Sequence, residues 1–188
     1  MPVLDKKITA PSGVDILPRL LAAREARAYL QRFFIGNVRW TGFVLQISLN
    51  IPGWPKRLDG DEAAIAAGEA AIRSALPVRP FANVFLRDAA GLAALMAFRD
   101  LRGGGVEPDV KNVKKISAEI ERRETWGRAL DIDVVTGRGP LSRSSVGLEP
   151  RRCLLCSEDA KICARMGRHR MDDLREMAGR LISSARLR

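Results

Sequence analysis

The sequence has few cysteines, few aromatic residues and no long apolar run, and each of these shortages argues against a class of protein. Three cysteines in 188 residues are too few, and odd in number, for a disulfide scaffold. No apolar run approaches the ~18–20 residues that cross a membrane as a helix, so we expect no transmembrane segment. The first residues lack the apolar core of a secretory signal peptide, which predicts a cytoplasmic protein. With one Tyr, six Phe and three Trp, the chain offers little surface for stacking nucleic-acid bases.

What the chain has in excess is positive charge, and most of that charge is arginine. Lys and Arg number 32 against 22 Asp and Glu, which gives a formal net charge of +10. Seven of the 32 cations are lysines and 25 are arginines. Because the planar guanidinium pairs bidentately with phosphate and carboxylate oxygens, the excess favours an anionic partner. An Arg-rich, Ala-rich and Gly-rich composition also follows from a GC-rich genome, so charge alone does not choose between nucleic acid, a nucleotide and no ligand.

The hydrophobic pattern predicts an α+β fold in which a mixed sheet is flanked by helices. Apolar residues recur at helical spacing in four segments, which are 17–34, 62–76, 109–123 and 171–187. Alternating or short apolar runs predict strands at 41–51, 82–86 and 130–135. Residues 91–99 fit either a helix or a strand, and Gly127 is expected to end the third helix.

Composition along the chain predicts a flexible N-terminal segment, 1–14, followed by a single domain over 15–188. The C-terminal part of this domain is rich in Cys and His and ends in the closing helix. The glycine-rich loop at 103–108 is the expected place for an insertion. Asp59 or Asp61 is expected to cap the helix that follows.

Two carboxylates, Asp131 and Asp133, lie two residues apart in the expected strand 130–135. Alternate residues of a strand project from the same face, so both side chains should lie close together. Two like charges at this separation are costly unless a cation lies between them, and paired carboxylate oxygens suit Mg²⁺. This pattern predicts a metal platform for phosphoryl or nucleotidyl transfer. The alternative is that one aspartate caps a turn and the other faces solvent.

All three cysteines and the only histidine fall within one 17-residue window. They are Cys153, Cys156, Cys163 and His169. Three thiolates and an imidazole are a ligand set for tetrahedral Zn²⁺, so 153–169 is a candidate structural zinc subsite. The alternatives are buried thiols that pack as small hydrophobes beside an unrelated histidine, and a redox role for the first two cysteines.

Arginines accumulate around both groups of candidate ligands. They are Arg128, Arg143, Arg151, Arg152 and Arg165. Such a cluster can neutralise a triphosphate, although each member alone can also be a solvated surface residue. A second polar group shares one face of the first expected helix and consists of Arg24, Arg27 and Gln31. A solvated helix face is the default interpretation of that trio.

These residues resemble a known family, the citrate lyase holo-acyl-carrier-protein synthases, also called apo-citrate lyase phosphoribosyl-dephospho-CoA transferases. The motifs are Gly127-Arg128 to Asp131-Ile132-Asp133-Val134, then Leu141-Ser142-Arg143, then Pro150-Arg151-Arg152-Cys153 to Cys163-Ala164-Arg165 and His169. The similarity is weaker over the segment Leu20 to Gln31. It covers the stretch from about residue 120 to 175 closely.

The resemblance implies a cytoplasmic enzyme with nucleotidyltransferase-like chemistry. Members move the phosphoribosyl-dephospho-CoA group from triphosphoribosyl-dephospho-CoA to a serine of the acyl carrier (gamma) subunit of citrate lyase, and release diphosphate. On this basis Asp131 and Asp133 are expected to hold Mg²⁺, and Arg128 and Arg143 to grip the leaving diphosphate. The polar trio on the first helix becomes a candidate donor-binding face.

The sequence departs from the family pattern at 124–126, where Glu-Thr-Trp stands in place of His-Pro-Leu. The missing histidine is a candidate base or phosphate ligand, so a transferase acting on a different carrier protein remains open. A member that serves only as an assembly partner also remains open. The competing class is a small zinc-containing basic module that binds nucleic acid. That class leaves the two aspartates without a purpose, because carboxylates repel a phosphate backbone.

Overall fold

A computed structural model describes residues 15–37, 42–99 and 109–187. Its helices and strands are α1 (Ile16–Asn37), β1 (Phe43–Leu49), α2 (Asp61–Ala75), β2 (Ala82–Asp88), β3 (Gly91–Phe98), α3 (Val110–Arg123), β4 (Leu130–Thr136), β5 (Gly139–Pro140), α4 (Ala160–Arg165) and α5 (Met171–Ser183). Three 3-10 turns are Trp126–Ala129, Ser144–Val146 and Ser184–Leu187. The N-terminal segment 1–14 and the loop 103–108 lie outside the described residues.

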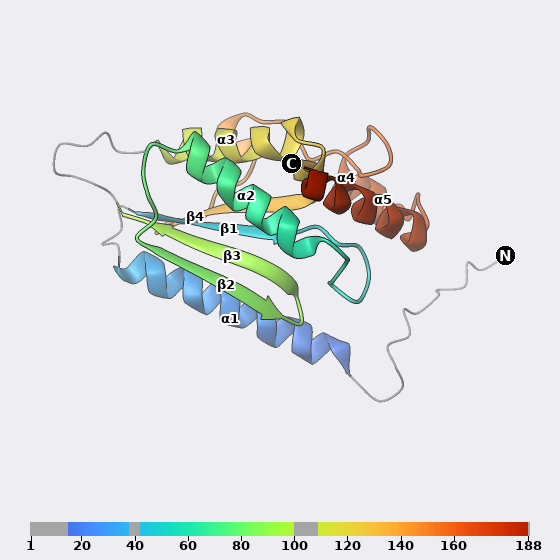
Figure 1. Ribbon diagram of the computed structural model, residues 1–188, viewed down its shortest axis with the longest axis horizontal. Coiled ribbons are helices and arrows are strands. Elements are labelled where there is room, and N and C mark those ends of the chain that lie inside the picture. Colours follow the sequence, from blue (N-terminus) through green and yellow to red (C-terminus); the bar gives the residue numbers. More distant parts are fainter. Residues whose placement is uncertain (1–14, 38–41, 100–108, 188) are drawn as a thin grey trace.

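The sheet has five strands in the order β2-β3-β1-β4-β5, and every described pair is antiparallel. β1-α2-β2 and β3-α3-β4 each return the chain to a parallel strand two positions away, with one strand between (Figure 1). This is the split βαβ arrangement of the ferredoxin-like fold. The predicted α+β class is confirmed. The expectation of a mixed sheet is wrong. The two strands joined by each crossover are parallel but not adjacent, and the strand between them runs in the opposite direction, so all neighbouring pairs are antiparallel.

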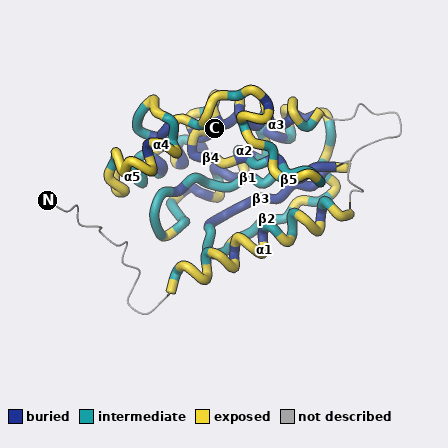
Figure 2. The backbone as a smooth tube through the Cα atoms, turned by 180° about the vertical axis from the view of Figure 1, so that it is seen from behind, coloured by how far each residue is buried: buried dark blue, intermediate teal, exposed yellow. Residues whose placement is uncertain are grey.

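The segment that fitted either a helix or a strand is β3, an interior strand between β2 and β1. All eight of its residues are buried, and the tube in Figure 2 is dark blue along this strand. A strand covered on both faces loses the alternation of apolar and polar residues and reads as a continuous apolar run. Periodicity alone therefore could not identify it.

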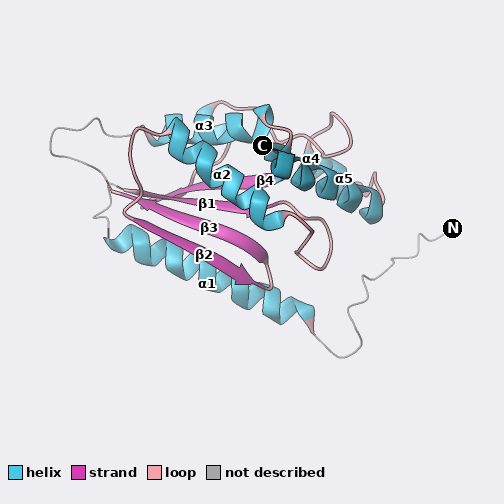
Figure 3. Ribbon diagram, in the orientation of Figure 1, coloured by secondary structure: helices cyan, strands magenta, loops and turns pink. Residues whose placement is uncertain are grey.

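Helices cover both faces of the sheet and create two cores (Figure 3). The larger core lies under α2, α3 and α5 and includes Leu45 and Ile47 of β1. The smaller core lies under α1, where Phe34 packs with Val44 and Leu95. Successive side chains of β1 point alternately into the two cores, so this strand packs against helices on both faces.

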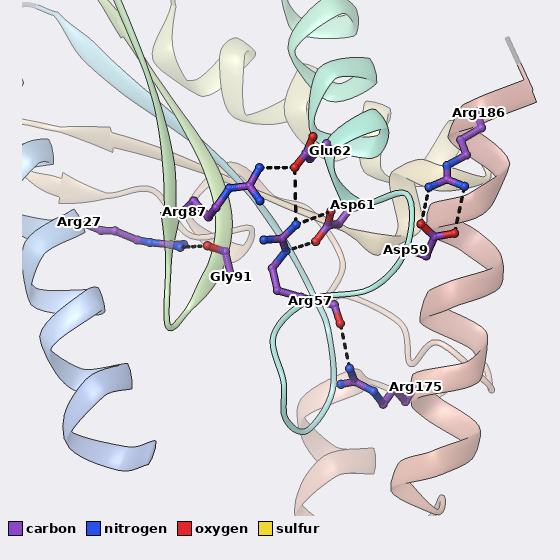
Figure 4. A network of polar contacts seen from close by, with 9 residues as sticks. All are labelled: Arg27, Arg57, Asp59, Asp61, Glu62, Arg87, Gly91, Arg175 and Arg186. Carbon is purple, nitrogen blue, oxygen red and sulfur yellow. Dashed lines mark hydrogen bonds and ion pairs between the residues drawn. The ribbon is translucent and has the colours of Figure 1, made fainter. Parts of the chain in front are cut away.

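The start of α2 differs from the expected cap. Its N-cap residue is Gly60, at φ 87°, and no side chain caps the helix. Asp59 instead forms two hydrogen bonds with Arg186, at 2.6 and 3.0 Å, and Asp61 pairs with Arg57 (Figure 4). The cap prediction is wrong because both carboxylates are engaged by guanidinium groups, whose charge-assisted hydrogen bonds are stronger than a cap bond.

Gly127 has a role other than the expected helix stop. Helix α3 ends at Arg123, and Gly127 lies in the 3-10 turn that leads into β4. A Cβ atom at this position would lie 2.2 Å from the carbonyl oxygen of Ile120. The absence of a side chain therefore lets the turn pack directly on the end of α3, and this contact places the start of β4.

We expect Gly127→Ala to destabilise the protein by about 2 kcal/mol or more, because the added methyl group meets backbone rather than a movable side chain. The midpoint of urea denaturation measures the change. The matched control is Gly179→Ala in α5, where a Cβ would have nothing within 4 Å. That control should be neutral or stabilising by up to about 1 kcal/mol. Equal midpoints for the two variants would contradict the close approach at Gly127.

Candidate active site

The two aspartates lie on the face of β4 that α1 covers. Leu130, Ile132 and Val134 alternate with them and are fully buried on the opposite face. In register with β1, Asp131 lies opposite Ser48 and Asp133 opposite Gln46. The strand geometry thus places both carboxylates side by side, as their spacing predicts.

A cavity of about 340 Å³ opens beside these carboxylates, between α1, β1, β4 and the loop after β1. The polar residues that line it are Arg24, Arg27, Gln31, Gln46, Ser48, Asn50, Lys56, Asp131 and Asp133. The structure therefore brings together the polar face of the first helix and the carboxylate pair, which lie about 100 residues apart in the sequence. Both groups were candidates in the sequence, but only the fold places them in one cavity.

The like charges of the carboxylate pair are only partly compensated by neighbouring cations. Burial and, after it, the neighbouring charge of Asp131 raise the pKa of Asp133 to about 6. Lys114 and Arg151 act in the opposite direction but do not offset the shift. The nearest cation to Asp131 among the described residues is Arg151, whose Nη1 lies 3.7 Å from Oδ1. A divalent cation bound by both carboxylates would relieve this repulsion.

Arg27 lines the cavity, but its guanidinium is engaged by the protein itself. It donates to Asp88 at 2.7 and 2.9 Å and to the carbonyl oxygen of Gly91 at 2.9 Å. Its side chain is only 7% exposed, so these contacts attach α1 to the β2–β3 hairpin. Gln31 donates to Gln46 at 2.9 Å. Arg24 differs from both, because among the described residues its side chain has no hydrogen-bond or ion-pair partner.

Strand β5 pairs with only the end of β4, and at Ile132 the outer edge of β4 is completed by charged side chains. Ile132 donates its N–H to Glu121 at 2.7 Å, and Lys114 donates to the carbonyl oxygen of Ile132 at 2.8 Å. Glu121 also forms ion pairs with Arg143 and Arg151. Sequence reasoning missed Lys114 and Glu121, although both are charged residues on the apolar face of the predicted helix 109–123. A charged residue on the apolar face of a helix is expected to be buried with a partner, and this was the sequence signal for both residues.

Most of the arginines proposed as phosphate ligands contact protein groups. Arg128 donates to the carbonyl oxygens of Cys153 and Leu154, at 3.0 and 3.1 Å. Arg143 and Arg151 pair with Glu121, and Arg151 also donates to the Leu130 carbonyl oxygen. These contacts tie the Cys/His segment to the sheet. The exposed side chains of the other two arginines have no such partner in the described chain; they are Arg152 and Arg165.

The three cysteines and His169 form one cluster. Their ligand atoms all lie within 4.8 Å of one another, and His169 Nε2 lies 3.3 Å from Cys156 Sγ. Burial and, after it, the neighbouring thiols of Cys153 and Cys156 raise the pKa of Cys163 to about 12. Burial also opposes ionisation of Cys153, but backbone N–H groups of the following turn donate to its sulfur and lower its pKa. The cluster has the composition and spacing to hold a metal ion.

The loop after β1 contributes a lysine that sequence reasoning missed. Lys56 lines the cavity and donates from Nζ to the carbonyl oxygen of Ile51 at 2.7 Å. Two neighbouring carbonyl groups of the loop, of Pro52 and Arg57, accept hydrogen bonds from Arg175 of α5, at 2.9 and 3.0 Å. The loop is therefore attached to the helix layer (Figure 4). No local pattern distinguishes this lysine, because its place depends on where the loop folds.

None of the helices in the described part of the chain combines the length and the apolar composition needed to cross a bilayer.

Comparison with known proteins agrees with the similarity noted in the sequence motifs. A family model described as apo-citrate lyase phosphoribosyl-dephospho-CoA transferase matches residues 16–185. A Streptococcus pyogenes protein named as a probable member is 28% identical, covering 95% of this chain and 91% of its own length. A Vibrio cholerae protein with the same name is 31% identical, with 84% and 86% covered. An Escherichia coli protein of this name is 45% identical over 65 residues, which are 34% of this chain and 36% of that protein.

Proposed function

This chain belongs to the apo-citrate lyase phosphoribosyl-dephospho-CoA transferase family, and from that premise we propose that it attaches this prosthetic group to a serine of the acyl carrier subunit of citrate lyase. The donor is triphosphoribosyl-dephospho-CoA. The serine oxygen forms a bond to the α-phosphorus, the bond from that phosphorus to the diphosphate breaks, and the hydroxyl proton passes to water. The observation that carries this proposal is the cavity in which the two aspartates meet the polar face of α1.

Asp131 and Asp133 are the residues that would hold Mg²⁺. Two adjacent carboxylates whose charge is only partly compensated are a hard-oxygen donor set, which fits this ion. When bound, Mg²⁺ supplies positive charge that offsets the charge of the donor phosphates. Asp131 has a side chain that is 52% exposed, whereas Asp133 is more deeply placed. The acceptor serine therefore has access to the cavity from the Asp131 side.

We assign the Cys/His cluster to a structural Zn²⁺. Its four ligand atoms match a closed Cys₃His site, in which tetrahedral geometry with Zn–S bonds near 2.3 Å separates ligand atoms by about 3.5–3.8 Å. The observed separations, up to 4.8 Å, allow this geometry after small side-chain adjustments. The N–H groups that donate to the Cys153 sulfur stabilise its thiolate form, as expected of a metal ligand. Thiolates kept reduced for metal binding fit a cytoplasmic location.

The competing nucleic-acid-binding module is not favoured. Such a module needs a surface of available cations, and this chain uses many of its arginines in contacts with its own carboxylates and carbonyl groups. The engaged arginines include Arg27, Arg57, Arg128, Arg143, Arg151 and Arg175. The Arg-rich composition thus serves internal contacts to a large extent.

Intact-mass measurement of a carrier protein tests the proposed transfer. Incubation of this protein with apo-carrier, the triphosphoribosyl donor and Mg²⁺ should increase the carrier mass by one prosthetic group. The carrier in which the acceptor serine is replaced by alanine should stay unmodified. An unchanged carrier mass with folded protein would contradict the proposal, and modification of only a non-citrate-lyase carrier would favour the related transferase.

A further inference from the structure

Besides the carboxylate pair, the cavity is lined by two cations whose side chains form no ion pair with a carboxylate among the described residues. Arg24 projects from α1 and Lys56 from the loop after β1, and both line the cavity. Arg175 of α5 lies close enough for its charge to act on Lys56. The pKa of Lys56 is lowered by burial first, and then by the charges of Arg24 and Arg175. Three cations from three separate elements therefore lie near one another, and none of them forms an ion pair with a carboxylate among the described residues.

The donors of these cations are only partly used. Among the described residues, the ammonium group of Lys56 makes one hydrogen bond, to its own loop at Ile51, and an ammonium group carries three N–H donors. The guanidinium of Arg24 has no partner among the described residues, and it carries five donors. Arg175 is different, because its bonds to Pro52 and Arg57 hold the loop in place. Arg24 and Lys56 are thus the two cations available to a ligand.

The backbone that carries Lys56 is held firmly in position. Its neighbour Arg57 pairs with Asp61 and Glu62, and Arg87 also pairs with Glu62 (Figure 4). On the other side, Gly91 packs so closely that a Cβ there would lie 2.5 Å from the Lys56 carbonyl oxygen. These contacts place the lysine without involving its ammonium group. A charge preorganised in this way loses little conformational entropy when an anion binds.

The buried Arg27 completes this support. Its Nη2 donates to the carbonyl oxygen of Gly91, the residue that packs on the backbone of Lys56. Arg27 therefore links α1, which carries Arg24, to the hairpin that supports the loop. It acts as a positioning residue, because its guanidinium is engaged by Asp88 and Gly91.

We propose that Arg24 and Lys56 form the binding site for the diphosphate portion of the donor, opposite in charge to the Asp131–Asp133 pair of the same cavity. The inference rests on the proposed function, because it assigns the terminal phosphates of that donor to these two cations. An arginine fork pairs with two phosphate oxygens and a lysine adds a point charge, a combination that suits a diphosphate. A volume of about 340 Å³ is near the lower end of ligand cavities, so it suits the phosphate end rather than the whole coenzyme-sized donor.

Arg128 and Arg143 were expected from the sequence resemblance to grip this group. Their contacts with Cys153, Leu154 and Glu121 use these donors inside the protein. Neither residue lines the cavity that contains the two aspartates. The cations of α1 and the loop therefore replace them as the proposed diphosphate ligands.

Calorimetric titration with inorganic diphosphate in the presence of Mg²⁺ tests the site directly. We expect the wild-type protein to bind diphosphate, and Lys56→Met and Arg24→Gln each to raise Kd about tenfold or more, as lost charge-assisted hydrogen bonds would. Lys56→Arg should retain most of the affinity. The matched controls are Lys115→Met on α3 and Arg19→Gln on the first turn of α1, which should bind within about twofold of wild type.

The outcomes separate this site from the proposed function. No diphosphate binding by wild type, or equal binding by the Lys56→Met, Arg24→Gln and control variants, would overturn the site even if transfer is observed. Diphosphate binding that depends on both cations, without modification of any carrier, would uphold the site and overturn the transfer. Circular dichroism and melting temperature identify a variant that fails to fold; if one of the two loss variants does, the other provides the comparison with wild type. In the transfer assay the two loss variants should raise the KM for the donor and leave the KM for the carrier unchanged.

Discussion

Asp131→Asn and Asp133→Asn each lower the rate of carrier modification by about 100-fold or more, with the protein still folded. Each substitution keeps the size of the side chain and removes one of the two negative charges that are expected to hold Mg²⁺. A catalytic metal ion contributes several kcal/mol to stabilising charge in the transition state, and 1.4 kcal/mol corresponds to a factor of ten in rate. The initial rate of the mass change in the carrier measures the effect at a fixed Mg²⁺ concentration.

The same two variants should behave in the opposite way in a stability measurement without metal. Removing one of two adjacent charges relieves their repulsion, and at Asp133 it also removes a charge that burial disfavours. Melting in the presence of EDTA should therefore occur at an equal or higher temperature than in wild type. Added Mg²⁺ should raise the melting temperature of wild type and have less effect on either variant.

Asp173→Asn is the matched control for these substitutions, because it is an exposed aspartate on α5 with no ion-pair partner in the described chain. It should leave the transfer rate and the Mg²⁺ response unchanged. Full transfer by Asp131→Asn would contradict a metal-holding role for the pair. A large loss of stability in both variants would instead indicate that the aspartates serve the fold.

The second large effect is expected from removal of the metal at the Cys/His cluster. The purified protein should contain one Zn²⁺ per chain, and Cys163→Ser should contain none. We expect this variant to melt about 10 °C or more below wild type, because the binding free energy of a structural zinc contributes to folding and each kcal/mol corresponds to about 2–4 °C at this chain length. Plasma emission spectrometry and scanning calorimetry measure the two quantities.

The reason for this large effect is the composition of the segment around the cluster. Helix α4 has only six residues, and Ile162 and Met166 at this helix are 49% and 67% exposed, so few apolar contacts hold it. Cys153 and Cys163 are the buried members of the segment, together with Leu154. Without the metal, the three thiols and His169 would attach this part of the chain only weakly.

Ser157→Ala is the control for the zinc prediction, because this exposed residue lies beside the cluster and is not a candidate ligand. It should retain the metal and the melting temperature of wild type. Treatment of wild type with a strong chelator should reproduce the Cys163→Ser melting temperature. Metal-free protein from zinc-supplemented cultures, with melting unaffected by the chelator, would show that the cysteines are simple buried thiols.

The carboxylate pair and the Cys/His segment meet at the outer edge of β4. Arg151 contacts Asp131 on one side and Glu121 on the other, and Arg128 anchors the carbonyl groups at Cys153. Arg151 therefore connects the chain segment of the Cys/His cluster to the cavity. The motif residues from Arg128 to Cys153, which lie close in the sequence, are therefore also connected by contacts in the structure.

Local chemistry made a large part of this protein predictable. The spacing of Asp131 and Asp133 determines that they share a face of a strand, and hydrophobic periodicity determines α1, α2, α3 and α5 to within a few residues. The clustering of all cysteines with His169 indicates a metal subsite, and the motifs indicate the family. These features depend on residues that are close in the sequence, where backbone geometry alone decides the outcome.

Only the tertiary structure decided which charges remain available. Arg27 lies 61 residues from its partner Asp88, and Arg143 and Arg151 lie 22 and 30 residues from the Glu121 that they pair with. Whether an arginine binds substrate or its own chain depends on such distant partners, which no spacing rule provides. The same reason applies to Lys56, which becomes part of the cavity because its loop folds against the hairpin and α5. The strand order was also decided by tertiary packing. A hydrophobic run in the sequence predicts a strand, but it does not specify which other strands lie beside it.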